Sequence, residues 1–226
     1  DGELVVFHDL SVDRLTLEEG RVADKTLAEM LTMDLGPVFD EEISGAYVHT
    51  FEDFVVACEG RGLLMTELKA TSASKTGIEE AAVAVLLKHD AFDRVLLSSF
   101  NPVVLWRLKR LDPRVRTVFI FMDTNWNAAL RAEIKDGDLV ELPWFLRTEP
   151  IRRAIRKIVK PDLLSVNITV NPATTTRLIE RGWPIFLWSP ITEPETSDAL
   201  GRHPHGLISD EVHLVKQMRD DAHPTR

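Results

Sequence analysis

Leu63-Leu64-Met65-Thr66-Glu67-Leu68-Lys69 begins the alternation that decides the fold, as an apolar, strand-like run that ends in a carboxylate and an ammonium group. Five similar runs follow, at residues 95–99, 117–122, 163–166, 185–188 and 206–209. Helix-like segments separate them, at residues 78–88, 102–111, 127–134, 151–158 and 173–181. Short strands that alternate with amphipathic helices predict βαβ units and a parallel sheet, hence an α/β fold.

Two charged residues follow the first of these strands. Alternate residues of a strand share a face, so Met65, Glu67 and Lys69 point one way and Leu64, Thr66 and Leu68 the other. Charges on an inward or rim-facing strand position call for a partner, a metal or a function. One interpretation is a structural Glu–Lys pair at a solvated strand end. The other is a carboxylate ligand for a hard divalent cation beside a lysine that binds an anionic oxygen.

A second strand-like run, at residues 4–7, ends in His8 and Asp9. In α/β proteins, ligands gather at the carboxyl ends of the parallel strands, so His8 and Glu67 together predict a catalytic rim. A histidine suits general acid–base chemistry near neutral pH. Asp9 can orient the ring or serve the following turn, and a purely structural His–Asp pair remains an alternative.

The remaining sequence predicts a single domain over residues 1–226. Residues 10–50 are expected to form a loop-rich insertion with one short helix near residues 26–31. Thr50 and Asp53 have the spacing of a helix-capping pair. The polar residues 219–226 are expected to form a frayed tail.

Composition excludes several classes of protein. The net charge of −9 argues against nucleic-acid binding, although local lysines or a metal still permit an anionic substrate. The single cysteine excludes an intrachain disulfide and zinc sites built on several cysteines. The sequence contains no run of 18 apolar residues, so no transmembrane helix is expected. A cytoplasmic location is compatible with the sequence, but a signal upstream of Asp1 would not be visible, so the compartment stays open.

Other strand ends carry weaker signals. Trp188 can line a substrate pocket or pack in the core. Ser98 and Ser99 have no Gly-x-Ser-x-Gly elbow, which disfavours a serine hydrolase. His203 and His205 flank a proline and are expected to lie in a loop, although their spacing also resembles a metal-binding pair.

Seven segments together resemble one family. They are Asp1 to Asp9, Asp13 to Thr16, Gly20 to Glu29, Thr66 to Lys69, Ser99 to Asn101, Phe186 to Ser189 and Gly206 to Asp210. In this order they resemble the motifs of the glycerophosphodiester phosphodiesterases, including H-D, E-x-K, S-F-[DN] and G-I-x-[ST]-D.

The resemblance implies a TIM-type barrel and metal-dependent cleavage of glycerophosphodiesters to glycerol 3-phosphate and an alcohol. It makes His8 one of two catalytic histidines, Glu67 a ligand of a divalent metal ion (Ca or Mg), and Lys69 and Trp188 substrate-binding residues. The partner is a small phosphodiester. The alcohol group, the metal and the oligomeric state stay open.

The resemblance is also incomplete. The family's H-R-G strand and E-x-D strand, with the other histidine and two more metal ligands, would precede Asp1. We therefore expect six of eight barrel strands, unpaired sheet edges at Glu67 and Ser209, and little activity from a chain truncated in this way. The family's W-T-x-N becomes Trp188-Ser189-Pro190-Ile191, and its final Asp-Pro becomes Asp210-Glu211.

Two other functions remain possible from the sequence. One is a related barrel phosphodiesterase that acts on lysophospholipids or sphingolipids. The other is a non-catalytic binding module of the same fold.

Overall fold

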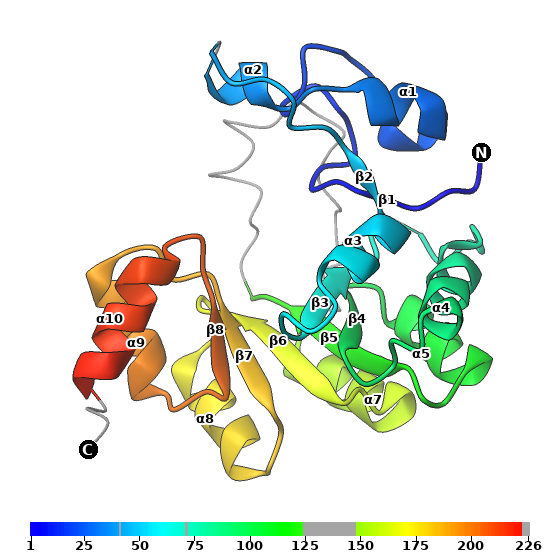
Figure 1. Cartoon of the computed structure of the whole chain (residues 1–226). Helices are drawn as coiled ribbons and strands as arrows, with labels where there is room; N and C mark the ends of the chain where they lie inside the picture. The colour runs from blue at the N-terminus through cyan, green and yellow to red at the C-terminus, as the bar shows by residue number, and fades with distance from the viewer. Residues whose placement is uncertain (41, 71, 124–147, 223–226) are drawn as a thin grey trace. The chain divides into compact units, whose positions relative to one another are not determined.

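The computed structural model describes residues 1–40, 42–70, 72–123 and 148–222 (Figure 1). Six strands form one parallel sheet in the order β3-β4-β5-β6-β7-β8, which confirms the α/β fold and the six predicted strands. The strands are β3 Leu64–Glu67, β4 Val95–Ser99, β5 Arg116–Phe121, β6 Leu163–Asn167, β7 Ile185–Trp188 and β8 Gly206–Ile208. Each strand pairs with its neighbours along the chain, as crossover helices require.

Helices alternate with these strands. They are α4 Ile78–Lys88, α5 Pro102–Leu111, α7 Glu149–Val159, α8 Pro172–Glu180, α9 Glu193–Gly201 and α10 Val212–Ala222. The helix expected at residues 127–134 lies outside the described residues. Helices α9 and α10 were not predicted, and α10 extends through Arg219 to Ala222, where the sequence suggested a tail.

The middle strands of the sheet are buried on both faces. All five residues of β6 are buried, and in β5 only Arg116 is exposed. Strands β3 and β8, the ends of the strand order, consist of half-buried residues. This gradient explains why the central strands lack a polar–apolar alternation.

The amino-terminal residues form a small sheet of their own. Strand β1 (Val5–Val6) pairs antiparallel with β2 (His49–Thr50). The segment between them is more structured than the predicted loop, because it contains both α1 (Leu27–Thr32) and α2 (Gly36–Phe39). It also has its own apolar cluster, made of Val12, Met30, Met33 and Val48.

Capping explains where two helices of this region begin. Thr26 and Glu29 form a capping box at the start of α1. Thr50 and Asp53 form another at α3 (Phe51–Ala57), which confirms the predicted pair. Each box satisfies backbone N–H groups that have no partner within the helix.

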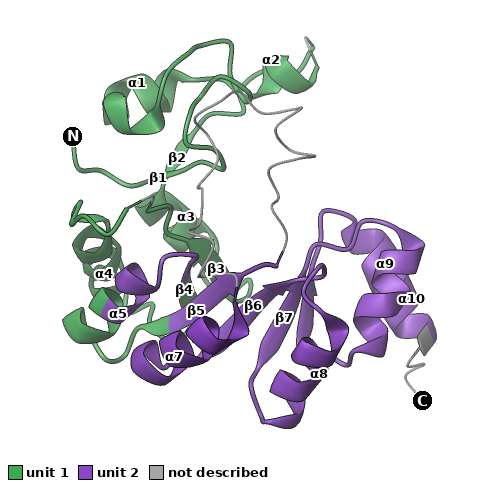
Figure 2. Ribbon diagram, turned by 180° about the vertical axis from the view of Figure 1, so that it is seen from behind, with its two compact units in different colours: residues 1–97, 107–116, 125–141 green, residues 98–106, 117–124, 142–226 purple. Residues whose placement is uncertain are grey.

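The chain divides into two compact units (Figure 2). Of the described residues, unit 1 contains residues 1–97 and 107–116, and unit 2 contains residues 98–106, 117–123 and 148–222. Within the described ranges, no helix has both the length and the apolar character needed to cross a membrane.

A glycine in β8 provides a test of the strand register. Gly206 lies opposite Phe186 of β7, and a Cβ atom at position 206 would approach Cε1 of that ring to 2.9 Å. We expect Gly206→Ala to lower the free energy of unfolding by about 1–3 kcal/mol, because the ring must shift.

Gly201 of α9 is the matched control, since a Cβ atom there meets nothing within 4 Å. Gly201→Ala should be neutral or stabilise by up to about 1 kcal/mol. Urea unfolding of the two variants compares them directly, and equal effects would contradict the pairing of Gly206 with Phe186.

Candidate active site

An ion pair marks the carboxyl end of β3. The Nζ atom of Lys69 donates to Oε2 of Glu67 at 3.0 Å, and the two side chains are 24% and 28% exposed. Leu68 between them is buried, which sets the two charged side chains on the accessible side of the segment. The pair is therefore open to a ligand, with a carboxylate and a cation side by side.

A second charged group surrounds Asp9. Its buried carboxylate accepts hydrogen bonds from Nε of Arg14 at 2.6 Å and from a terminal guanidinium nitrogen at 2.8 Å. Nδ1 of His8 lies 2.6 Å from the same carboxylate. The His8 side chain itself is 70% exposed.

The charge on Asp9 determines which nitrogen of His8 is available. Burial by itself raises the pKa of Asp9, but hydrogen bonds from Arg14 and His8 outweigh it, so this pKa lies below its ordinary value. An ionised carboxylate only accepts hydrogen bonds, so Nδ1 of His8 is the donor. Nε2 is left to exchange a proton with a ligand, as general acid–base chemistry requires.

The structure corrects one premise of the sequence analysis. His8 does follow a strand, but β1 belongs to the two-stranded sheet and not to the parallel sheet. A run of two strand residues is too short for its sheet to be assigned from sequence periodicity. No hydrogen bond or ion pair among the described residues joins His8 to Glu67 or Lys69, so their convergence on one site stays a prediction.

The fourth predicted residue, Trp188, belongs to unit 2. It is the last residue of β7 and is half-buried, and its ring meets Phe100 edge-on, with centroids 5.9 Å apart and planes at 86°. Asn101, in the same turn as Phe100, accepts a hydrogen bond from the backbone of Val103 and so helps to begin α5.

Sequence reasoning missed Asn167. This residue ends β6, is 4% exposed and pairs in register with Trp188. Its Oδ1 accepts from the backbone N–H and the hydroxyl of Thr169, and its amide nitrogen donates to no described residue. The signal was present, because an amide directly follows the apolar run at residues 163–166.

His205 lies in a loop, as expected. Its Nδ1 accepts a hydrogen bond from the backbone N–H of Ile185 at 3.2 Å, which attaches the loop to the start of β7.

The sequence matches the model of the glycerophosphoryl diester phosphodiesterase family over residues 1–214. The chain belongs to this family. A glycerophosphodiester phosphodiesterase of Caldanaerobacter subterraneus subsp. tengcongensis is 29% identical over 80% of this chain and 82% of that protein. One of Bacillus subtilis is 30% identical over 80% of this chain and 67% of that protein. The predicted family and enzyme class, a phosphodiesterase, are thereby confirmed.

A solved structure shares the fold. An Oleispira antarctica phosphodiesterase, determined in complex with the product sn-glycerol-3-phosphate, aligns with a TM-score of 0.74. It is 21% identical, and the alignment covers 97% of this chain and 81% of that protein.

Glu67 by itself does not make a metal site. Ca²⁺ takes about six to eight oxygen ligands and Mg²⁺ about six. The ranges that the structure describes contain no group of three or more His, Cys, Asp or Glu side chains able to hold a metal ion. Glu67 thus supplies one suitable oxygen ligand. A complete set of metal ligands is not found among the described residues.

The hydrogen bonds that His8 and Arg14 make with the Asp9 carboxylate should make the stability of the fold depend on pH. Because the pKa of Asp9 is lowered by folding, its contribution is present above the unfolded value of about 3.9 and is lost as the pH falls through the folded value. We expect Asp9→Asn to lower the free energy of unfolding at pH 7 by about 1–2 kcal/mol. The difference should shrink steadily below about pH 4.

Asp24→Asn is the matched control, because Asp24 is exposed and its side chain pairs with no described residue. Urea unfolding of both variants between pH 3 and pH 7 measures the effect. A cost for Asp9→Asn that does not change with pH would show that its charge does not stabilise the fold.

Proposed function

We propose that this protein hydrolyses glycerophosphodiesters to glycerol 3-phosphate and an alcohol. The observation that carries the proposal is the half-buried but accessible Glu67–Lys69 pair at the carboxyl end of β3, in a chain of this family. The names of the relatives support it, as does the sn-glycerol-3-phosphate bound to the Oleispira antarctica protein.

The proposed chemistry assigns separate tasks to the side chains. The ammonium group of Lys69 binds a non-bridging oxygen of the phosphodiester and offsets its negative charge. Water supplies the oxygen of the new P–O bond. As the bond from phosphorus to the alcohol oxygen breaks, that oxygen takes the proton that His8 carries on Nε2. One proton of the water then restores the proton on Nε2, and the other passes from the product phosphate to solvent.

Asp9 and Arg14 are positioning residues in this scheme. The Asp9 carboxylate holds Nδ1 of His8, and the two bonds from Arg14 hold the carboxylate. At the other strand ends, Trp188 is proposed as a substrate-binding residue, and Asn167 has an amide nitrogen able to donate to a phosphate or glycerol oxygen.

A divalent metal ion, Ca²⁺ or Mg²⁺, is part of the proposal, with Glu67 as one ligand. Such an ion polarises a phosphoryl oxygen when it is bound. Its other ligands are not assigned among the described residues.

The assay follows release of glycerol 3-phosphate from glycerophosphocholine. It is run on the protein with and without a chelator. We expect chelation to abolish hydrolysis and added Ca²⁺ or Mg²⁺ to restore it. Binding of the diester without hydrolysis would contradict the proposal and favour the binding module.

Replacement of His8 tests the proton transfer. His8→Ala should lower kcat by roughly 10²–10⁴-fold and leave the metal concentration for half-maximal activity unchanged. His213→Ala, at an exposed histidine of α10, is the control and should be neutral. A His8→Ala variant with wild-type turnover would remove His8 from the reaction.

Replacement of Glu67 tests the metal ligand separately. Glu67→Gln should raise the metal concentration for half-maximal activity, because it removes a charged oxygen ligand. Glu52→Gln removes a carboxylate that is likewise ion-paired, to Lys88 at 2.6 Å, and should not change that concentration. Equal metal dependence in the two variants would contradict a ligand role for Glu67.

A further inference from the structure

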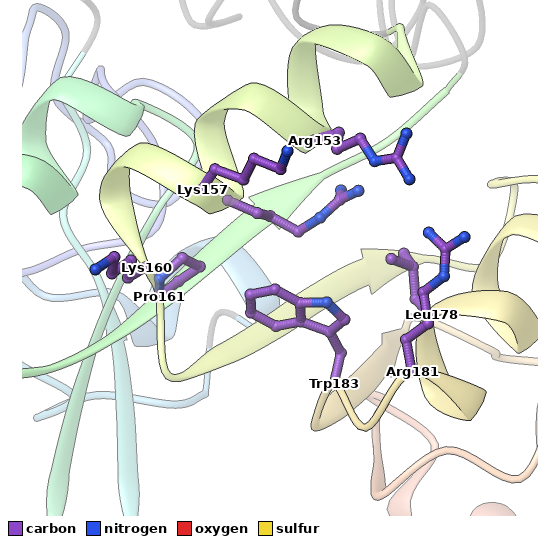
Figure 3. A pocket seen from close by; sticks show the side chains of 8 residues that line it. Arg153, Lys157, Lys160, Pro161, Leu178, Arg181 and Trp183 are labelled. Carbon is purple, nitrogen blue, oxygen red and sulfur yellow. The ribbon is translucent and has the colours of Figure 1, made fainter.

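A pocket of about 420 Å³ lies between α7 and the end of α8 in unit 2 (Figure 3). Its lining is Arg153, Arg156, Lys157, Lys160, Pro161, Leu178, Arg181 and Trp183. A neighbouring hollow of about 350 Å³ shares Arg153, Leu178 and Arg181 and adds Arg177. We call the two together the cationic pocket.

The exposed cations of this pocket have no partner in the part of the chain that the structure describes. Among the described residues, none forms a hydrogen bond or ion pair with the side chains of Arg153, Lys157, Lys160, Arg177 or Arg181. The other arginines of α7 behave differently. Arg152 is buried and bonds to Asp123 at 2.5 Å, and Arg156 is buried and paired with Glu149. Helix α7 thus pairs its buried arginines, whereas its exposed cations have no partner within the described ranges.

Local acids do not balance this charge. No aspartate or glutamate lines the larger hollow, and Glu149 of the smaller one is already bound by Arg156. Arg153 and Lys157 are four residues apart on α7, as are Arg177 and Arg181 at the end of α8, and like charges at this spacing repel. The helix dipole favours Lys157, Lys160, Arg177 and Arg181, which lie at the C-terminal ends of α7 and α8, but it does not favour Arg153 in the middle of α7. In a chain of net charge −9, such a local concentration of positive charge requires another explanation.

The floor of the pocket is apolar. Pro161 and Leu178 are buried, and Trp183 is half-buried. In Figure 3 the side chains of Arg153 and Lys157 from α7 and those of Arg181 and Trp183 lie around the same hollow. Arginine forks match phosphate oxygens, and a tryptophan face accommodates an apolar or planar group.

The cationic pocket is separate from the strand ends that carry candidate site residues in this unit. Lys160 and Pro161 precede β6, and Arg181 and Trp183 precede β7. Asn167 and Trp188 end the same two strands. A strand of this length places its two ends roughly 10–13 Å apart.

We propose that the cationic pocket binds a small soluble anion that carries two or more phosphate groups. The site is additional to the proposed hydrolytic function, and its occupant is not the diester substrate. The free anion is favoured over an anionic lipid surface because the cations surround a concave hollow with an apolar floor.

Titration calorimetry with inorganic pyrophosphate, in buffer without divalent cations, tests the proposal. The wild-type protein should bind pyrophosphate, and Arg153→Gln combined with Arg181→Gln should weaken binding by at least about tenfold. Arg21→Gln combined with Arg61→Gln removes the same charge at two exposed positions in unit 1 and should change the affinity less than twofold. Hydrolysis of glycerophosphocholine should be the same in both double variants.

Two further measurements separate the alternatives. Lys69→Gln should retain pyrophosphate binding, and loss of binding there would place the anion at the candidate active site and overturn the proposal. Equal weakening by both arginine pairs, or no binding to the wild type, would also overturn it. Sedimentation with phosphatidylglycerol vesicles, against phosphatidylcholine vesicles, tests the lipid source. Arginine-dependent vesicle binding without pyrophosphate binding would contradict the proposed occupant.

Discussion

The parallel pairing of consecutive strands is the constraint on which the candidate site depends. From β5 to β8 each strand lies beside the next in parallel register, with Asn167 paired to Trp188 and Trp188 to Ile208. Parallel neighbours place their carboxyl ends at the same edge, so residues distant in sequence end adjacent strands. The middle strands hold this register through close packing on both faces, because a slip of one residue would exchange buried side chains of different size between the faces.

Some charged side chains of this protein are buried in ion pairs, and others are accessible to solvent. Arg152 and Arg156 are buried and paired, and the carboxylate of Glu79 is buried against Arg107 at 3.2 Å. Such pairs satisfy charges that folding removes from water. The side chains of Glu67, Lys69 and His8 are accessible instead, as the proposed binding of a phosphodiester requires.

Much of the fold was predictable because its signals are local. The bounds of β4, β7, α4 and α5 follow from apolar runs and periodicity. The capping residues Thr50 and Asp53 predicted the start of α3. Helix α9 was missed because its residues lack an apolar repeat, although Thr192 and Glu195 form a capping box. The pairing of β1 with β2 joins residues more than 40 positions apart and leaves no periodic signal in two-residue strands.

The candidate site was predictable only in part, for a similar reason. Glu67 and Lys69 are two residues apart on one strand, so the alternation of a strand already placed them together. His8 and Asp9 are neighbours, but the bonds from Arg14 that order the group depend on the fold of the following turn. Asn167 needed the register of two strands before its place beside Trp188 could be seen.

A structure determined with glycerol 3-phosphate bound would test the central claim most directly. The account predicts a phosphate oxygen within hydrogen-bond distance of Nζ of Lys69, about 2.7–3.2 Å. A well-ordered glycerol 3-phosphate bound elsewhere, with Lys69 still paired only to Glu67, would contradict it.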